Sequence, residues 1–120
     1  MSHTDTQTRL KHMRDAAAKA VQFVQGRNRS DLDTDEMLAL ALVRLLEIVG
    51  EAAKGVEESV RQMRPLIPWK QIAGTRDCLI HGYFDVDHDI VWAILTNDLP
   101  PLIAELEAML ASSPVPPSTP

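Results

Sequence analysis

The 120-residue sequence has little of what small secreted, fibrous and membrane proteins depend on. Its single cysteine, Cys78, cannot form an internal disulfide, and no charged and then apolar leader opens the chain, so we expect a cytoplasmic protein. Five glycines and 24% charged residues are too few for a collagenous or a disordered chain. No apolar run approaches the roughly 18 residues that span a bilayer, so we expect no membrane partner.

Aromatic side chains are also scarce, with two Trp, two Phe and one Tyr. Strands favour aromatic and β-branched residues, whereas this chain is rich in Ala, Leu and Met, which favour helices, so we predict an all-α fold. The 12 Lys and Arg are outnumbered by 17 Asp and Glu, and the net charge of −5 argues against a protein that coats DNA. The length suits one domain with its own core.

Apolar periodicity predicts a first helix from about residue 5 to residue 25, with Thr4 and Gln7 as a capping box and Gly26 as its stop. After a polar connection, Asp33 or Thr34 is the expected cap of a second helix.

The second helix carries apolar residues at alternating steps of four and three, which is typical of a seam in a helical bundle. The seam residues are Leu38, Leu42, Leu45, Val49, Ala52 and Val56. Further apolar residues flank the seam, namely Leu40, Val43, Leu46 and Ile48. One core requires only one stripe, so the surplus predicts a second buried face supplied by another copy of the chain.

Pro65 and Pro68 interrupt the pattern, and a third, short helix is expected from Trp69 to about Ile80 or His81. Gly82 suits the left-handed residue just past its end. A fourth helical stretch, residues 90–110, is expected to kink or restart at the two prolines 100–101. We assign residues 1–111 to one helical domain and residues 112–120, which are rich in Pro and Ser, to a disordered tail. The methionines at 13, 37, 63 and 109 are expected to fill the core.

The stretch "RDCLIHGY", residues 76–83, concentrates residue types that suit a phosphate substrate. Arg76 offers a fork of donors that matches phosphate oxygens, and His81 titrates near neutral pH and can transfer a proton. In mid-helix these two side chains would diverge by roughly 140°, so they converge only if His81 lies at a helix end. Each residue alone also has an ordinary role: Arg76 can pair with Asp77, His81 can lie on the surface, and Tyr83 can be half buried.

Arg76, His81 and Tyr83 match the R-x4-H-x-Y motif, and here the sequence resembles the HEPN-domain toxins. It is most similar to the HepT-like group, which is paired with minimal nucleotidyltransferase antitoxins of the MntA type. The flanking stretches resemble that group as well: "LLEIVGEAAKGV" at 45–56, "IPWKQIAGTRDCLIHGYFDVD" at 67–87 and "IVWAILTNDLPPLI" at 90–103.

The resemblance implies an antiparallel HEPN-type bundle of four to five helices that forms a homodimer. It also implies a metal-independent endoribonuclease without cofactors, in which His81 is the general acid or base and Arg76 stabilises charge on the RNA phosphate at the dimer interface. Glu51 would support that site, and Tyr83 would accept AMP from the MntA-type antitoxin and so switch the toxin off. Asp77 stands where the family commonly has Asn, and its carboxylate could neutralise Arg76.

Three alternatives remain open. The chain can be a non-catalytic helical module that binds a nucleotidyltransferase or nucleic acid, a function that Asp77 favours. A metal site can be drawn from the cluster His81, Asp85, Asp87, His88 and Asp89, although Asp85 suits a turn and Asp87 a helix N-cap. The chain could also be the protective partner, but it has no phosphate-gripping glycine loop. The cations at 9, 11, 14, 19, 27 and 29 can guide RNA or simply form a solvated helix face.

Overall fold

The computed structural model describes residues 3–74 and 86–112, and every element in those ranges is helical. The elements, in chain order, are α1 (His3–Phe23), α2 (Asp31–Thr34), α3 (Glu36–Lys54), α4 (Glu58–Arg61), α5 (Trp69–Ala73), α7 (His88–Ala93), η1 (Ile94–Asp98) and α8 (Leu99–Ser112). The all-α prediction is confirmed. No helix in these ranges is long and apolar enough to cross a membrane.

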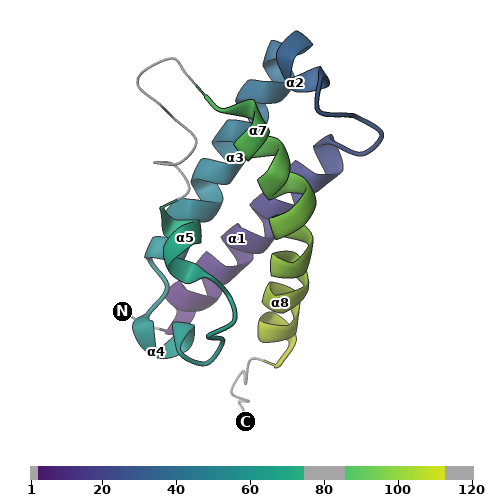
Figure 1. Cartoon of the computed structure of the whole chain (residues 1–120). Helices are drawn as coiled ribbons and strands as arrows, with labels where there is room; N and C mark the ends of the chain where they lie inside the picture. Colours follow the sequence, from purple (N-terminus) through teal and green to yellow (C-terminus); the bar gives the residue numbers. More distant parts are fainter. Residues whose placement is uncertain (1–2, 75–85, 113–120) are drawn as a thin grey trace.

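Three long segments form the body of the bundle (Figure 1): α1 packs along α3 on one side and along α8 on the other. Alanines on the two facing helices make the close approach possible, with Ala17 and Ala20 on α1 and Ala53 on α3 fully buried. Larger side chains fill the remaining space, among them Met13 of α1 and Leu106 of α8. This single core is what the helical periodicity predicts.

The ends of the first two long helices differ slightly from the prediction. Gly26 has a φ of 75°, so it provides the predicted stop after α1. The helix already includes His3, so Thr4 lies inside α1 instead of capping it. The cap of α3 is Asp35, whose carboxylate accepts the Leu38 N–H at 3.0 Å, and the expectation of Asp33 or Thr34 is wrong. The short helix α2 precedes this cap and was not predicted.

The buried side of α3 largely follows the predicted seam, since Leu42, Val49 and Ala52 are buried, and so is Val56 just past the end of the helix. The prediction is wrong for two neighbouring residues. It placed Leu45 in the seam and Leu46 beside it, but Leu46 is only 1% exposed, whereas Leu45 is partly buried. Of the four flanking residues, Leu46 belongs to the core, Val43 and Ile48 are partly buried against it, and Leu40 is 63% exposed, so a second face buried by another copy stays a prediction.

Of the four methionines expected in the core, Met13 and Met109 are buried. The expectation is wrong for Met37 and Met63, which are 83% and 74% exposed.

The C-terminal end of α3 is fastened by Arg61 of α4. Its Nη2 donates to the carbonyl oxygens of Ala53 at 2.8 Å and Lys54 at 3.3 Å, and its Nε donates to Val56 O at 3.1 Å. The last carbonyls of a helix have no partner within that helix, and a guanidinium is well suited to satisfy several of them. This contact fixes the chain where it turns from α3 towards α5.

The last helical stretch changes its winding before the two prolines. The Leu99 N–H donates to Ile94 O, a step of five residues, and residues Ile94–Asp98 form a π turn between α7 and α8. Pro100 and Pro101 have no N–H to continue the α-helical ladder, so a wider turn before them is a physical consequence of the sequence. The predicted interruption thus takes the form of a π turn.

Candidate functional site

Most of the predicted site lies outside the described residues. Arg76, Asp77, His81, Tyr83 and Asp85 all fall in the range 75–85, and so does Gly82. The structure describes Glu51 and the residues Asp87, His88 and Asp89, together with the elements that lead into and out of the motif segment. Those elements show how the two ends of the segment are held.

The chain reaches the motif segment through α5, which packs on α3 at Gly50. Gly50 is buried, and a β-carbon there would lie 3.1 Å from Ile72 O and 3.6 Å from Ala73 O, so glycine allows the backbones to approach. At the start of α5, Trp69 is 6% exposed and its Nε1 donates to Arg64 O at 3.1 Å. The predicted start at Trp69 is confirmed, but α5 already ends at Ala73, well before the expected end at Ile80 or His81.

Glu51 follows Gly50 on α3. Its side chain is 74% exposed, and its Oε1 lies 3.9 Å from Nζ of Lys54, the residue one turn further along. A pair this exposed contributes little to stability. Glu51 therefore lies on the surface next to the point where α5 meets α3, and the predicted supporting role stays a prediction.

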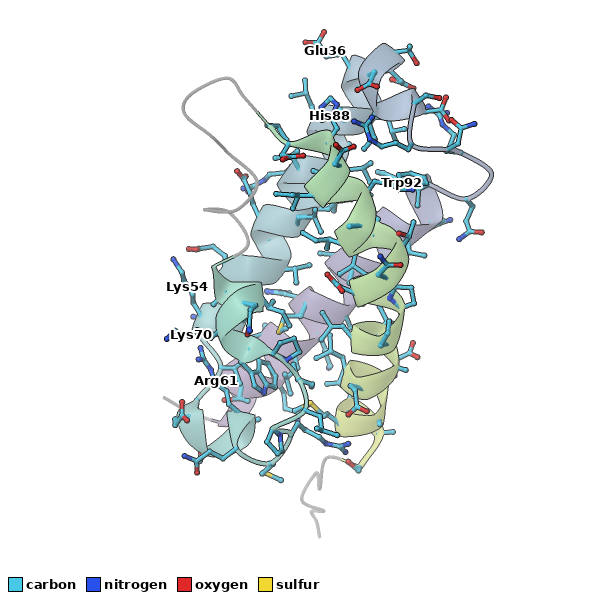
Figure 2. All side chains as sticks on the ribbon, in the orientation of Figure 1. Glu36, Lys54, Arg61, Lys70, His88 and Trp92 are labelled. Atoms are coloured by element: carbon cyan, nitrogen blue, oxygen red, sulfur yellow. The ribbon has the colours of Figure 1, made fainter. Side chains whose placement is uncertain are left out.

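The chain leaves the motif segment through the first turn of α7, which Asp87 caps. Its carboxylate accepts from Asp89 N at 3.0 Å and Ile90 N at 3.2 Å, which confirms the predicted N-cap. His88 Nδ1 lies 3.0 Å from Asp33 Oδ1 of α2. Figure 2 shows His88 at this end of the molecule, and Lys70 of α5 at the other end of α3.

Arg29 completes a charged cluster with Asp33, His88 and Asp89. Its Nε donates to Asp89 Oδ1 at 2.7 Å, and its Nη1 donates to Asp33 Oδ2 at 2.9 Å. The hydrogen bond to His88, and then that from Arg29, hold the pKa of Asp33 below its usual range. The cluster joins residues 55 and 60 positions apart, so it ties the start of α7 to α2.

The eleven residues 75–85 therefore connect two fixed points. One is the contact of α5 with Gly50, and the other is the charged cluster beside Asp35 at the start of α3. Fifteen residues of helix separate Gly50 from Asp35, which corresponds to about 20 Å along α3. The described elements on either side of the predicted site are thus held at two points, one at Gly50 of α3 and one at α2.

The pKa of Asp33 leads to a prediction for acid unfolding. We expect Asp33→Asn to lower the midpoint of thermal unfolding near neutral pH, and the difference from the unchanged protein to begin to shrink at about pH 4 and to disappear only in stronger acid. Because the pKa of Asp33 is lower in the folded protein, its carboxylate stabilises the fold above the unfolded-state pKa, and this contribution is lost as the pH falls through the folded-state pKa. Asp15→Asn, at a side chain 65% exposed, is the control. A difference that stayed constant from pH 7 to acid would contradict the assignment.

The described residues of the predicted metal site have other partners. Asp87 binds the backbone of α7, His88 is directed to Asp33, and Asp89 to Arg29. Among the described residues, no group of three or more His, Cys, Asp or Glu side chains could hold a metal ion. His81 and Asp85, the other predicted members, lie outside these residues.

Several of the cations considered for guiding RNA have protein partners. Arg27 Nη2 lies 2.6 Å from Asp35 Oδ2, Arg29 is held in the charged cluster, and Arg14 Nε lies 2.8 Å from Asp15 Oδ1. The hydrogen bond from the Leu38 N–H, and then that from Arg27, lower the pKa of Asp35. These contacts favour a structural role for these arginines.

Sequence reasoning missed the partners in the charged cluster. The spacing of Arg29 and Asp33 at i and i+4 was a usable signal for one ion pair. No local pattern connects either residue with α7.

Comparison with known proteins gives consistent matches. The family model "Ribonuclease HepT-like" matches residues 13–109. A protein from Methanocaldococcus jannaschii named "Putative RNase" is 32% identical over 107 residues, which is 89% of this chain and 98% of that protein. Another "Putative RNase", from Caldanaerobacter subterraneus subsp. tengcongensis, is 37% identical over 84% of this chain and 90% of its own length. The "Probable ribonuclease HepT" of Thermococcus cleftensis is 34% identical over 77% of this chain and 87% of its own length. No solved structure gives a significant match.

Proposed function

The chain belongs to the HepT-like ribonuclease family, and from this membership we propose that it is a metal-independent endoribonuclease, the toxin of a toxin–antitoxin pair. The observation that carries the proposal is the family match over residues 13–109, a range in which the chain retains Arg76, His81 and Tyr83 at the motif spacing. Relatives of nearly the same length are named as RNases. RNA is the substrate.

In the proposed mechanism the nucleophile is the RNA's own 2′-hydroxyl. Its oxygen attacks phosphorus, the bond to the 5′-oxygen breaks, and that oxygen needs a proton as it leaves. His81 removes the first proton or supplies the second. Arg76 donates hydrogen bonds to the phosphate oxygens, where negative charge increases in the transition state.

The two anchors of the motif segment suit this mechanism. A proton transfer requires the imidazole within hydrogen-bond reach of the reacting oxygen, and small displacements are costly. Gly50 fixes the point at which the chain enters the segment, and the charged cluster around Asp33 and His88 fixes the point at which it leaves. The rigid face of α3 then serves as the scaffold of the site.

The active form is proposed to be a homodimer built on the exposed face of α3. Met37 and Leu40 are 83% and 63% exposed there, on the side that turns away from the core. In an antiparallel pair of α3 helices this face of one copy packs on the same face of the other copy, so the contact is self-complementary. The family resemblance implies that in such a dimer the two Arg76–His81 pairs share one cleft.

The dimer proposal predicts that Leu40→Glu yields a monomer and lowers RNA cleavage together with the loss of the dimer. A buried, unpaired carboxylate is costly at an interface, whereas in a monomer it lies in water. Light scattering after gel filtration measures the mass. Met63→Glu, at a side chain 74% exposed outside α3, is the control and should change neither property. A Leu40→Glu protein that remained dimeric would refute this interface.

Tyr83 is the proposed regulatory site. A nucleotidyltransferase of the MntA type transfers AMP from ATP to its hydroxyl, so that an O–P bond forms and pyrophosphate leaves. The added phosphate lies next to Arg76 and His81 in the chain and competes with RNA for their charge. The modified protein is then inactive.

Asp77 favours a second candidate function, a non-catalytic module that only binds a nucleotidyltransferase or nucleic acid. A carboxylate directly after Arg76 can pair with the guanidinium and repel RNA phosphate. In that case Asp77→Asn, which restores the residue common in the family, would not produce cleavage. For a weakened nuclease it would increase the rate.

The proposed function is tested with purified protein that carries no modification. We expect it to cut cellular RNA in the presence of EDTA, and to lose this activity when co-expression with the partner nucleotidyltransferase adds the mass of AMP to the peptide containing Tyr83. A folded, unmodified protein that cuts no RNA under these conditions would disprove the nuclease. Cleavage without any modification of Tyr83 would remove only the regulatory part.

A further inference from the structure

An apolar groove of about 530 Å³ runs along the bundle, separate from the exposed face of α3. Its floor is formed by Leu46 and Val49 of α3. One wall is the stretch from Leu66 to Ile72, which includes α5, and the other wall runs through α7, η1 and α8 from Ile90 to Glu105. In Figure 1, α5 lies beside the lower part of α3, and α7 leads into α8, which runs down the opposite side of the bundle.

The shape of the groove suits an elongated occupant. Along the second wall, Ile90, Ile94, Asp98, Leu102 and Glu105 line the groove at steps of four, four, four and three, so they form one stripe. Fifteen residues of helix correspond to about 20 Å, or about four turns. A trough of that length fits the side of an α-helix better than it fits a compact small molecule.

The rim of the groove is open and apolar at one point in particular. Leu66 is 93% exposed, while its neighbour Ile67 is 4% exposed and packs inside. A leucine held in water between Pro65 and Ile67 gains free energy when an apolar partner covers it. Leu66 is therefore positioned to contact an occupant of the groove.

The charge of the lining is of one sign. Two carboxylates, Asp98 and Glu105, lie on the α8 side, and no Lys or Arg is found among the described lining residues. Glu105 also accepts from Arg64 Nη1 at 3.2 Å, and its side chain is still 44% exposed. A partner with basic side chains along one edge matches this wall.

We propose that the groove binds an amphipathic helix of a partner protein, whose apolar side chains at i, i+3, i+4 and i+7 pack against the partly buried Ile72, Ile90 and Ile94. Lysine or arginine on the edge of that helix faces Asp98 and Glu105. The occupant belongs to another protein because a second copy of this chain, with a net charge of −5, would bring further negative charge to a wall that already carries Asp98 and Glu105. The inference does not depend on the nuclease activity.

Binding is measured by fluorescence anisotropy of a labelled 16-residue test peptide with leucine at i, i+3, i+4, i+7 and i+11 and lysine at the flanking positions. A twin peptide carries glutamate in place of lysine. We expect the lysine peptide to bind the full-length protein at least about tenfold more tightly than the glutamate peptide at low salt. Equal binding of the two, or no binding of either, would overturn the proposal.

Variants locate the binding site. Leu66→Glu should weaken binding of the lysine peptide by about tenfold or more, whereas Met63→Glu, at a side chain 74% exposed outside the groove, should leave it within twofold. Asp98→Lys should shift the preference towards the glutamate peptide, and Asp15→Lys on α1 should not. Both target side chains are exposed, so folding is preserved. An equal loss in the control variants would refute the groove as the site.

Two further readouts separate the remaining explanations. A fall in assembly size for Leu66→Glu, measured by light scattering, would mean that a second copy occupies the groove and would overturn the assignment to a partner protein. RNA cleavage by Leu66→Glu should equal that of the unchanged protein. Failure of the proposed nuclease would therefore leave the peptide results unaffected.

Discussion

We expect His81→Ala to lower the rate of RNA cleavage by about 10²–10⁴-fold, the contribution of a positioned general acid or base. Alanine can neither take the proton of the 2′-hydroxyl nor supply one to the leaving oxygen. Arg76 still binds the phosphate in this variant, so the loss should fall on kcat and leave KM nearly unchanged. Single-turnover cleavage of a labelled RNA in EDTA measures the effect.

The matched control is His12→Ala, which removes an exposed histidine from α1. Its cleavage rate should equal that of the unchanged protein, and both variants should keep the same thermal midpoint. If His81→Ala cleaved as fast as His12→Ala, proton transfer by His81 would be ruled out. The binding module favoured by Asp77 would then be the better description.

The sequence predicted the bundle well because helical periodicity depends only on local spacing. It could not decide between Leu45 and Leu46, which lie three and four residues after Leu42 and both continue its stripe. The choice depends on how α3 is rotated against its neighbours, and that rotation is set by the alanines of α1 and by Gly50 under α5. Contacts between distant elements therefore decide which of the two leucines is buried.

The caps of α3 were ambiguous for a similar reason. Asp31, Asp33 and Asp35 are all suitable N-caps, and they lie at steps of two. In the structure Arg29 engages Asp33, while Asp35 accepts from Leu38 N and also from Arg27. The final assignment depends on partners in the preceding loop and in α7.

The sequence predicted the motif residues of the candidate site but not the contacts that hold the elements around them. The motif of Arg76, His81 and Tyr83 is readable because its spacing is short and its flanks are distinctive. The charged cluster that follows that motif cannot be predicted from the sequence, since it joins residues 55 and 60 positions apart. The sequence shows a glycine at position 50, but only the structure shows why it is needed: a β-carbon on Gly50 would lie close to Ile72 O of α5. The apolar groove likewise exists only when α3, α5 and the stretch from α7 to α8 are packed together.

The assignment of α3 leads to the second large effect, on stability. We expect Leu46→Ala to lower the free energy of unfolding by about 2–4 kcal/mol, because the side chain is 1% exposed and its removal combines lost burial with a cavity. The value should stay below the top of the range for such truncations, because Leu46 also forms part of the groove floor, where neighbours can relax. Domains of this size have a total stability of about 5–15 kcal/mol, so the loss is a large fraction.

Urea unfolding at a constant m-value measures this change, with Leu66→Ala and Leu45→Ala as comparisons. Leu66 is 93% exposed, so the same truncation there should cost less than about 0.5 kcal/mol. Leu45 is partly buried and should give a value in between. If Leu45→Ala cost more than Leu46→Ala, the rotation of α3 would be the one expected from the sequence seam. In that case other residues of α3 would form the floor of the groove and the exposed face of the helix. Comparing Leu45→Ala with Leu46→Ala therefore also tests the geometry of the groove and of the proposed dimer interface.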